Sequence, residues 1–477
     1  MRRVSDSLVR GWGRLGPGLL PFADAASDEL PLTRLLRLSL FQVSVGMAVV
    51  LLTGTLNRVM IVELGVPAWL VSLMVALPLV FAPLRALIGY RSDVYRSALG
   101  WRRVPFIWIG TLLQFGGLAI MPFALILLSG DSRGPEIYGQ IGAALAFLLV
   151  GAGLHTTQTA GLALATDLAP EETRPRVVAL LFVTLLLGMF CSALIFGALL
   201  ADFSQLRLIK VIQGAALLTL ALNMAALWKQ EKLNPDRTRG DADTPSFREA
   251  WRRLASDPRS TRLLVAVALG TAGFTMQDVL LEPFGGEGLG LSVSATTVLT
   301  ALLAGGTLAA FGVAARCLDR GMDPHRLAGY GALVGIVAFA IVTLIAAVQS
   351  AALFRFGAAL IGFGAGLFAV GTLTAAMNLA AHSGSGLALG AWGAVQATAT
   401  GIGVAGGGAL RDLLSGLAAG GALGPAFSGP STGYGFVYQL EVVLLFATLI
   451  AIGPLARHAA RDEGMKSSGI GLADLPG

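Results

Sequence analysis

The chain has 477 residues, of which 55% are hydrophobic and only 13% are charged, about half the charged share of soluble domains. Its formal net charge is +6. The basic residues lie in short gaps beside long apolar stretches, which is typical of membrane topology and excludes nucleic acid as a partner.

About twelve apolar stretches, each of roughly 20 residues or more, follow one another along the chain. A run of this length crosses the hydrocarbon core as a helix, and the period-two alternation of barrel strands is missing. The sequence therefore predicts an all-α membrane protein with twelve transmembrane helices, at residues 37–63, 67–90, 104–129, 138–165, 177–201, 208–229, 262–286, 291–316, 327–348, 352–378, 386–410 and 433–455.

The distribution of basic residues predicts the orientation. Of the 34 lysines and arginines, 27 fall on the N-terminal side of the predicted membrane and five on the opposite side. Because basic loops stay in the cytoplasm, both termini are expected there.

The longest polar segment is a linker between two six-helix halves. The predicted parts are an N-terminal segment with an interfacial helix, the first half, the linker, the second half and a cytoplasmic tail, at residues 1–36, 37–229, 230–261, 262–455 and 456–477.

Two loops on the expected cytoplasmic side share a pattern. The loops Gly89 to Pro105 and Gly312 to Arg326 each have a glycine near the span end, followed by an aspartate and basic residues. Such charges can tie adjacent helices together and stabilise one access state of the bundle, or they can simply set topology. The predicted charge-relay residues are Asp93, Arg96, Arg102, Arg103, Asp167, Glu171, Arg174, Asp319 and Arg320.

The first of these loops resembles the signature of the major facilitator superfamily, although Val94 stands where a basic residue usually follows the aspartate. Five longer runs resemble the PucC/LhaA family, the light-harvesting complex assembly factors of purple phototrophic bacteria. The runs are NRVMIVELGVPAW (57–69), FAPLRALIGYRSD (81–93), RSALGWRRVPFIW (96–108), GTAGFTMQDVLLEPFGGE (270–287) and GLALGAWGAVQATATG (386–401). The resemblance covers about residues 30–455.

The resemblance implies the major facilitator fold and a place in the bacterial inner (intracytoplasmic) membrane, in contact with lipid. It implies that the protein assembles light-harvesting complexes, with the core antenna favoured, by binding bacteriochlorophyll and delivering it to antenna polypeptides. The reaction-centre core is a further candidate partner. Two alternatives stay open, a pigment-free scaffold for the antenna ring and a secondary transporter of a small solute. Homo-oligomerisation stays open as well.

The sequence carries no Walker lysine loop, zinc-ligand spacing, nucleophile elbow or dinucleotide fingerprint. We therefore do not expect an enzyme.

Four polar residues within predicted spans form a candidate intramembrane charge cluster. Asp278 and Glu282 lie four residues apart on one face of span 7, and Asn57 and Arg58 lie at the corresponding depth of span 1. Ionisable groups inside a membrane are costly unless they are paired, so we expect Arg58 to face Asp278 or Glu282. The cluster can be a structural clamp, a substrate or proton site, or a group exposed at the outer interface.

His155 and Gln158 lie in an unusually polar stretch of span 4. A neutral imidazole is a good axial ligand for the Mg²⁺ of bacteriochlorophyll, so these two residues are the candidate pigment-binding residues. The alternative is a histidine that is hydrogen-bonded inside the bundle.

Glycine pairs with four-residue spacing gather in the second half, where they can serve internal helix packing or accept a partner helix or a pigment ring. The pairs are Gly331 and Gly335, Gly362 and Gly366, Gly386 and Gly390, and Gly403 and Gly407.

Overall fold

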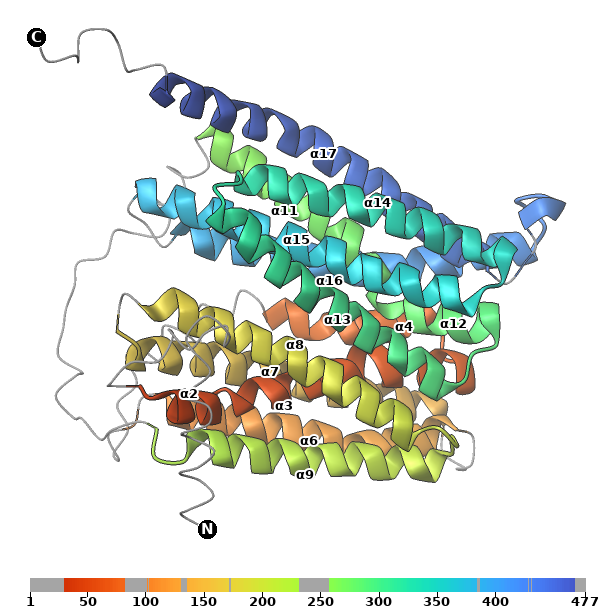
Figure 1. The fold of residues 1–477 in the computed structure, drawn as a ribbon. Coiled ribbons are helices and arrows are strands. Elements are labelled where there is room, and N and C mark those ends of the chain that lie inside the picture. The colour runs from red at the N-terminus through yellow and green to blue at the C-terminus, as the bar shows by residue number, and fades with distance from the viewer. Residues whose placement is uncertain are drawn as a thin grey trace, which may run out of the picture.

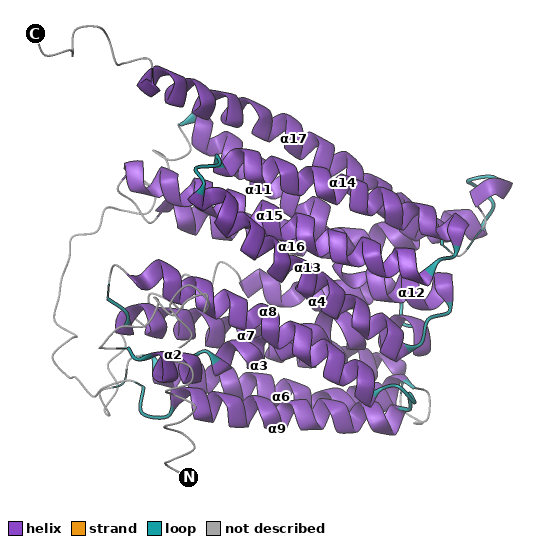
Figure 2. Cartoon of the chain, in the orientation of Figure 1, coloured by secondary structure: helices purple, strands orange, loops and turns teal. Residues whose placement is uncertain are grey.

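The computed structural model describes residues 30–81, 101, 103–129, 135–170, 173–230, 257–383, 387–427, 429 and 431–467. Within these ranges every regular element is a helix (Figure 2). Nine of the described helices are long and apolar enough to cross a membrane, and a bent pair adds a tenth. The protein is therefore a multi-pass helical membrane protein. The number of twelve spans stays a prediction, because residues 82–90 of predicted span 2 lie outside the described part.

The helices of the N-terminal part lie together in Figure 1, coloured red to yellow-green. They are α2 (Leu32–Leu38), α3 (Leu40–Val49), η2 (Val50–Leu56), η3 (Val59–Glu63), α4 (Ala68–Ala76), η4 (Leu77–Phe81), α6 (Val104–Leu128), α7 (Glu136–Leu168), α8 (Arg174–Leu199) and α9 (Gln205–Leu227).

The helices of the C-terminal part form a second group beside the first (Figure 1). Two long contacts join the groups, one between α8 and α13 and the other between α4 and α16. The elements are α11 (Pro258–Thr275), η7 (Met276–Val279), α12 (Leu281–Leu289), α13 (Val293–Asp319), α14 (Pro324–Val348), α15 (Ala351–Ser383), α16 (Leu387–Ala419), η8 (Pro425–Phe427) and α17 (Thr432–Ser467).

Local sequence sets where several helices begin. The Asp257 carboxylate accepts backbone hydrogen bonds at the start of α11, and Asp323 does the same for α14. Pro258 and Pro324 follow as the first helical residues, where a missing backbone N–H is tolerated. Ser292 caps α13 by accepting from the third residue of that helix.

Glycines let the C-terminal helices approach closely. A Cβ at Gly362 would lie 1.9 Å from the Leu303 backbone oxygen of α13, and one at Gly331 would lie 2.5 Å from the Phe368 nitrogen of α15. At Gly407 the nearest atom would be the Met276 oxygen, at 2.6 Å. The internal packing expected of Gly331, Gly362 and Gly407 is therefore confirmed.

The first helices of the two groups are both irregular. Span 1 changes from α-helix to two π-helical segments, η2 and η3, which flank Asn57 and Arg58. Span 7 passes through the 3₁₀ turn η7 and bends by 45° before α12. Because η2 contacts η7 and η3 contacts α12, the two irregular regions meet each other. Breaks in the regular helix pattern often mark functional positions, and the polar residues gather here.

Candidate functional site

Arg58 is almost completely buried, and its guanidinium joins two segments. It forms an ion pair with Glu63, one turn further along span 1, and donates a hydrogen bond of 3.1 Å to the backbone oxygen of Leu291. The expected ion pair with Asp278 or Glu282 is not formed, although Arg58 stays within electrostatic range of Glu282. The guanidinium instead passes over Gly286, where a Cβ would lie 2.9 Å from its Nη2 atom.

Glu282 is buried at the junction of three helices. The hydroxyl group of Thr300 in α13 donates a hydrogen bond to Oε1 of Glu282. Beside this hydrogen bond lies Gly54 of η2, where a Cβ would be 2.6 Å from the same oxygen and 2.9 Å from the Thr300 hydroxyl oxygen. The glycine therefore makes the space that the carboxyl group occupies. Oε2 of Glu282 is buried and has no hydrogen-bond partner.

Asp278 lies in the 3₁₀ turn of span 7, beside Asn57 of span 1. The Asn57 amide nitrogen is 3.5 Å from the backbone oxygen of Asp278 and also donates to the Thr53 backbone oxygen. The Asp278 carboxylate accepts from the side-chain amide of Gln277 at 2.5 Å. The structure thus brings Asn57 to the backbone of Asp278 and Glu282 to Thr300, rather than pairing either acid with Arg58.

Sequence reasoning missed Glu441, a fully buried acid in α17. Its Oε1 accepts the backbone N–H of Gln277 at 2.7 Å, at the break in span 7, and its Oε2 has no partner. The charge of Asp278 is close enough to act on it. An acidic residue in the apolar run VYQLEVVLL was the signal that could have found it. We call Asp278, Glu282 and Glu441 the carboxyl cluster.

A second polar network surrounds Arg411 and Asp412 of α16. Arg411 of α16 pairs with Glu287 of α12 and with Asp412, and its guanidinium lies 4.6 Å from the Tyr434 ring centre. The Tyr434 hydroxyl donates to Glu287 at 2.9 Å. Oδ2 of Asp412 accepts the Trp69 backbone N–H in the first turn of α4, at 2.7 Å. We call these five residues the latch, because they connect α4 of the N-terminal group to three C-terminal helices.

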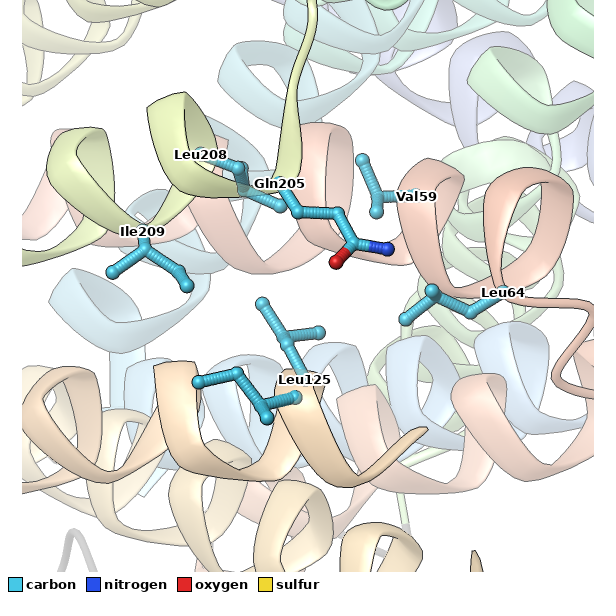
Figure 3. Close-up of a pocket in the computed structure, with 7 residues that line it drawn as sticks. Val59, Leu64, Leu125, Gln205, Leu208 and Ile209 are labelled. Atoms are coloured by element: carbon cyan, nitrogen blue, oxygen red, sulfur yellow. The ribbon is translucent and has the colours of Figure 1, made fainter. Parts of the chain in front are cut away.

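A small apolar pocket with a cavity volume of about 20 Å³ opens between span 1, α6 and α9 (Figure 3). This volume holds about one water molecule, so a tetrapyrrole ring with its tail does not fit there. Its lining residues are Val59, Leu64, Leu125, Ile126, Gln205, Leu208 and Ile209.

His155 and Gln158 lie in α7, and the structure places them away from that pocket. His155 is half-buried one turn after Gly151, where a Cβ would lie 2.1 Å from Pro78 of η4. Gln158 is buried. The described pocket does not connect the pair to a space for pigment, so ligation by His155 stays a prediction.

Two of the predicted charge-relay residues form an ion pair with each other at the other end of the bundle. Arg103 donates to Asp167 at 3.0 Å and so ties the start of α6 to the end of α7. Asp319 and Arg320 are exposed at the end of α13, and no ion pair joins either to another described residue. The remaining candidates lie outside the described residues or have no described side chain, namely Asp93, Arg96, Arg102, Glu171 and Arg174.

Residues 55–460 match the family described as PUCC protein. The chain belongs to this family. It is 60% identical to Protein PucC of Rhodovulum sulfidophilum over 86% of this chain and 92% of that protein. It is 55% identical to a Rhodobacter capsulatus protein described as an uncharacterized protein in the puhA-bchM intergenic region, over 100% of this chain and 99% of that one. PUCC family membership therefore extends over nearly the whole chain.

Solved structures with a similar fold are transporters. The nucleoside transporter NupG has a TM-score of 0.65 at 13% identity and covers 88% of this chain and 99% of its own. A bacterial homologue of the iron transporter ferroportin, in an inward-facing state, has a TM-score of 0.63 at 15% identity, with 89% of this chain and 99% of its own covered. At this identity the likeness shows the fold alone, so the PUCC protein has a transporter-like architecture.

Proposed function

We propose that this protein is an assembly factor for bacterial photosynthetic light-harvesting complexes, with the core antenna as the favoured partner. The observation that carries the proposal is PUCC family membership over residues 55–460. We place the protein in the bacterial inner membrane with both termini in the cytoplasm, because the basic residues favour that orientation.

We further propose that it binds bacteriochlorophyll as cargo and delivers it to antenna polypeptides. A relative, 28% identical over 90% of this chain, is named a bacteriochlorophyll synthase 44.5 kDa chain. His155 is half-buried rather than sealed in the core, which suits a side chain that must bind and release a ring. Gln158, one turn away, would orient the ring by hydrogen bonding. Neither residue performs covalent chemistry in this proposal.

The test is gentle purification from a phototrophic host, followed by an absorption spectrum and mass spectrometry of the co-purified polypeptides. Bacteriochlorophyll bands together with antenna subunits support delivery. Antenna subunits without pigment contradict the pigment step and favour a scaffold. A colourless protein without antenna subunits contradicts both steps and favours a transporter, which the similar solved structures would suit.

His155→Ala tests the pigment ligand within the same preparation. We expect the variant to lose the pigment bands while it retains the antenna subunits. His325→Ala is the control, because His325 lies at the start of α14, far along the chain from the proposed site. Equal pigment in both variants would contradict the role of His155.

A further inference from the structure

The three acids of the carboxyl cluster lie within the membrane-spanning part of the protein, and none of them forms an ion pair with another described residue. Glu282 is 3% exposed and Glu441 is 0% exposed. Arg58 pairs with Glu63 and Arg411 pairs with Glu287 and Asp412. The described residues give neither Glu282 nor Glu441 an ion pair.

Hydrogen bonding does not replace the missing cation. Glu282 accepts from the Thr300 hydroxyl and Glu441 accepts from the Gln277 backbone N–H, while Oε2 of each acid is buried without a partner. An ionised carboxylate offers about four acceptor positions, and an isolated buried charge costs far more than one neutral hydrogen bond returns. Buried acids in such surroundings bind a proton instead of keeping the charge.

The neighbours of each acid are few. Glu282 faces Thr300 of α13, Gly54 of η2 and, at longer range, Arg58. Glu441 faces Gln277 and Asp278 of η7, together with Tyr438 on its own helix.

Among the described residues, no group of three or more His, Cys, Asp or Glu side chains is arranged to hold a metal.

We propose that Glu282 and Glu441 form a membrane-embedded proton-binding site, in which each carboxyl group binds one proton. Binding forms an O–H bond on one carboxylate oxygen and leaves the other as the acceptor for Thr300 or Gln277. The site is independent of pigment binding, so its failure and the failure of the proposed function are distinguishable.

The position of the site gives proton binding a structural consequence. Glu441 holds the backbone of Gln277 at the 3₁₀ turn where span 7 bends, and Glu282 fills the space beside the π-helical part of span 1. Removing the proton from Glu441 places a negative charge at the backbone N–H of Gln277, beside Asp278. This new charge acts on the bend itself, at the contact between the two helix groups.

Infrared spectroscopy of the purified full chain tests the proposal, because a protonated carboxyl has a C=O band that an ionised carboxylate lacks. We expect the wild-type protein to show this band at neutral pH and to lose it as the pH is raised. Glu282→Gln and Glu441→Gln should each remove the contribution of one carboxyl group to this band. Glu136→Gln, at an exposed position at the start of α7, should leave the band unchanged.

Two results would overturn the proposal. One is the absence of the protonated-carboxyl C=O band from the wild-type protein at neutral pH. This measurement does not depend on whether any variant folds. The other is a band that both glutamine variants retain in full. A comparison of melting temperatures in sodium chloride and choline chloride provides a separate check. If sodium chloride raises the melting temperature of the wild type, and neither Glu282→Gln nor Glu441→Gln shows that rise, the ligand is a metal cation rather than a proton.

Discussion

Gly408 of α16 lies against Ser72 of α4, so closely that a Cβ at Gly408 would be 1.8 Å from the Ser72 hydroxyl oxygen. This contact joins the two helix groups beside the latch. Gly408→Ala must therefore push the helices apart, and overpacking of this kind costs about 1–3 kcal/mol. We expect a lower melting temperature in detergent. Gly406→Ala is the control, since nothing lies within 4 Å of the Cβ position there, and equal melting of both variants would contradict the prediction.

Arg58→Gln should also destabilise the protein. The change removes the ion pair with Glu63 and the hydrogen bond to the Leu291 oxygen, and hydrogen bonds to charged groups contribute about 1.5–3 kcal/mol each. Thermal unfolding in detergent measures the loss. Arg207→Gln removes an exposed pair with Asp202 and should have almost no effect, because surface ion pairs contribute little. If Arg58→Gln has the same melting temperature as Arg207→Gln, Arg58 does not act as a structural clamp.

Asp412→Ala should open the latch at its contact with α4. The variant leaves the Trp69 backbone N–H without its acceptor, and loss of such a cap costs about 1 kcal/mol. We expect a cysteine-reactive probe to label a cysteine introduced at Ser72 faster in this variant than in the otherwise unchanged protein. Asp202→Ala, which removes an exposed carboxylate, is the control for labelling. Unchanged labelling in Asp412→Ala would show that the latch does not hold α4.

Asp257 lies before the first span of the C-terminal group and gives a pH prediction. The hydrogen bond from the Ser260 hydroxyl group lowers the pKa of Asp257 below its usual range, and hydrogen bonds from the backbone N–H groups of Ser260 and Arg259 contribute less. A lowered pKa in the folded state means that the ionised cap stabilises the protein above the unfolded-state pKa and that this contribution is lost as pH falls through the folded-state pKa. Asp257→Ala should lower the melting temperature by an amount corresponding to about 1 kcal/mol near neutral pH and by less in acid. A difference in melting temperature between the wild type and Asp257→Ala that grows in acid would contradict this prediction.

The predicted charge cluster shows what sequence could and could not supply. Their depth in the two spans indicated that Asn57 and Arg58 lie near Asp278 and Glu282, and the structure places Asn57 at the Asp278 backbone. Which side chain pairs with which was decided by Gly54 and Gly286, whose missing Cβ atoms leave room for the Glu282 carboxyl and the Arg58 guanidinium. Such space depends on neighbouring helices and leaves no pattern in one sequence.

The sequence by itself determined the class of this protein, because long apolar runs can satisfy their backbone in a membrane only as helices. It also determined the family, since the runs that carry the resemblance lie within the matched residues. Only the tertiary structure decided that Glu441 reaches the break in span 7 and that Asp412 caps α4. Both contacts join residues more than 150 positions apart, and only helix packing brings such residues to one point.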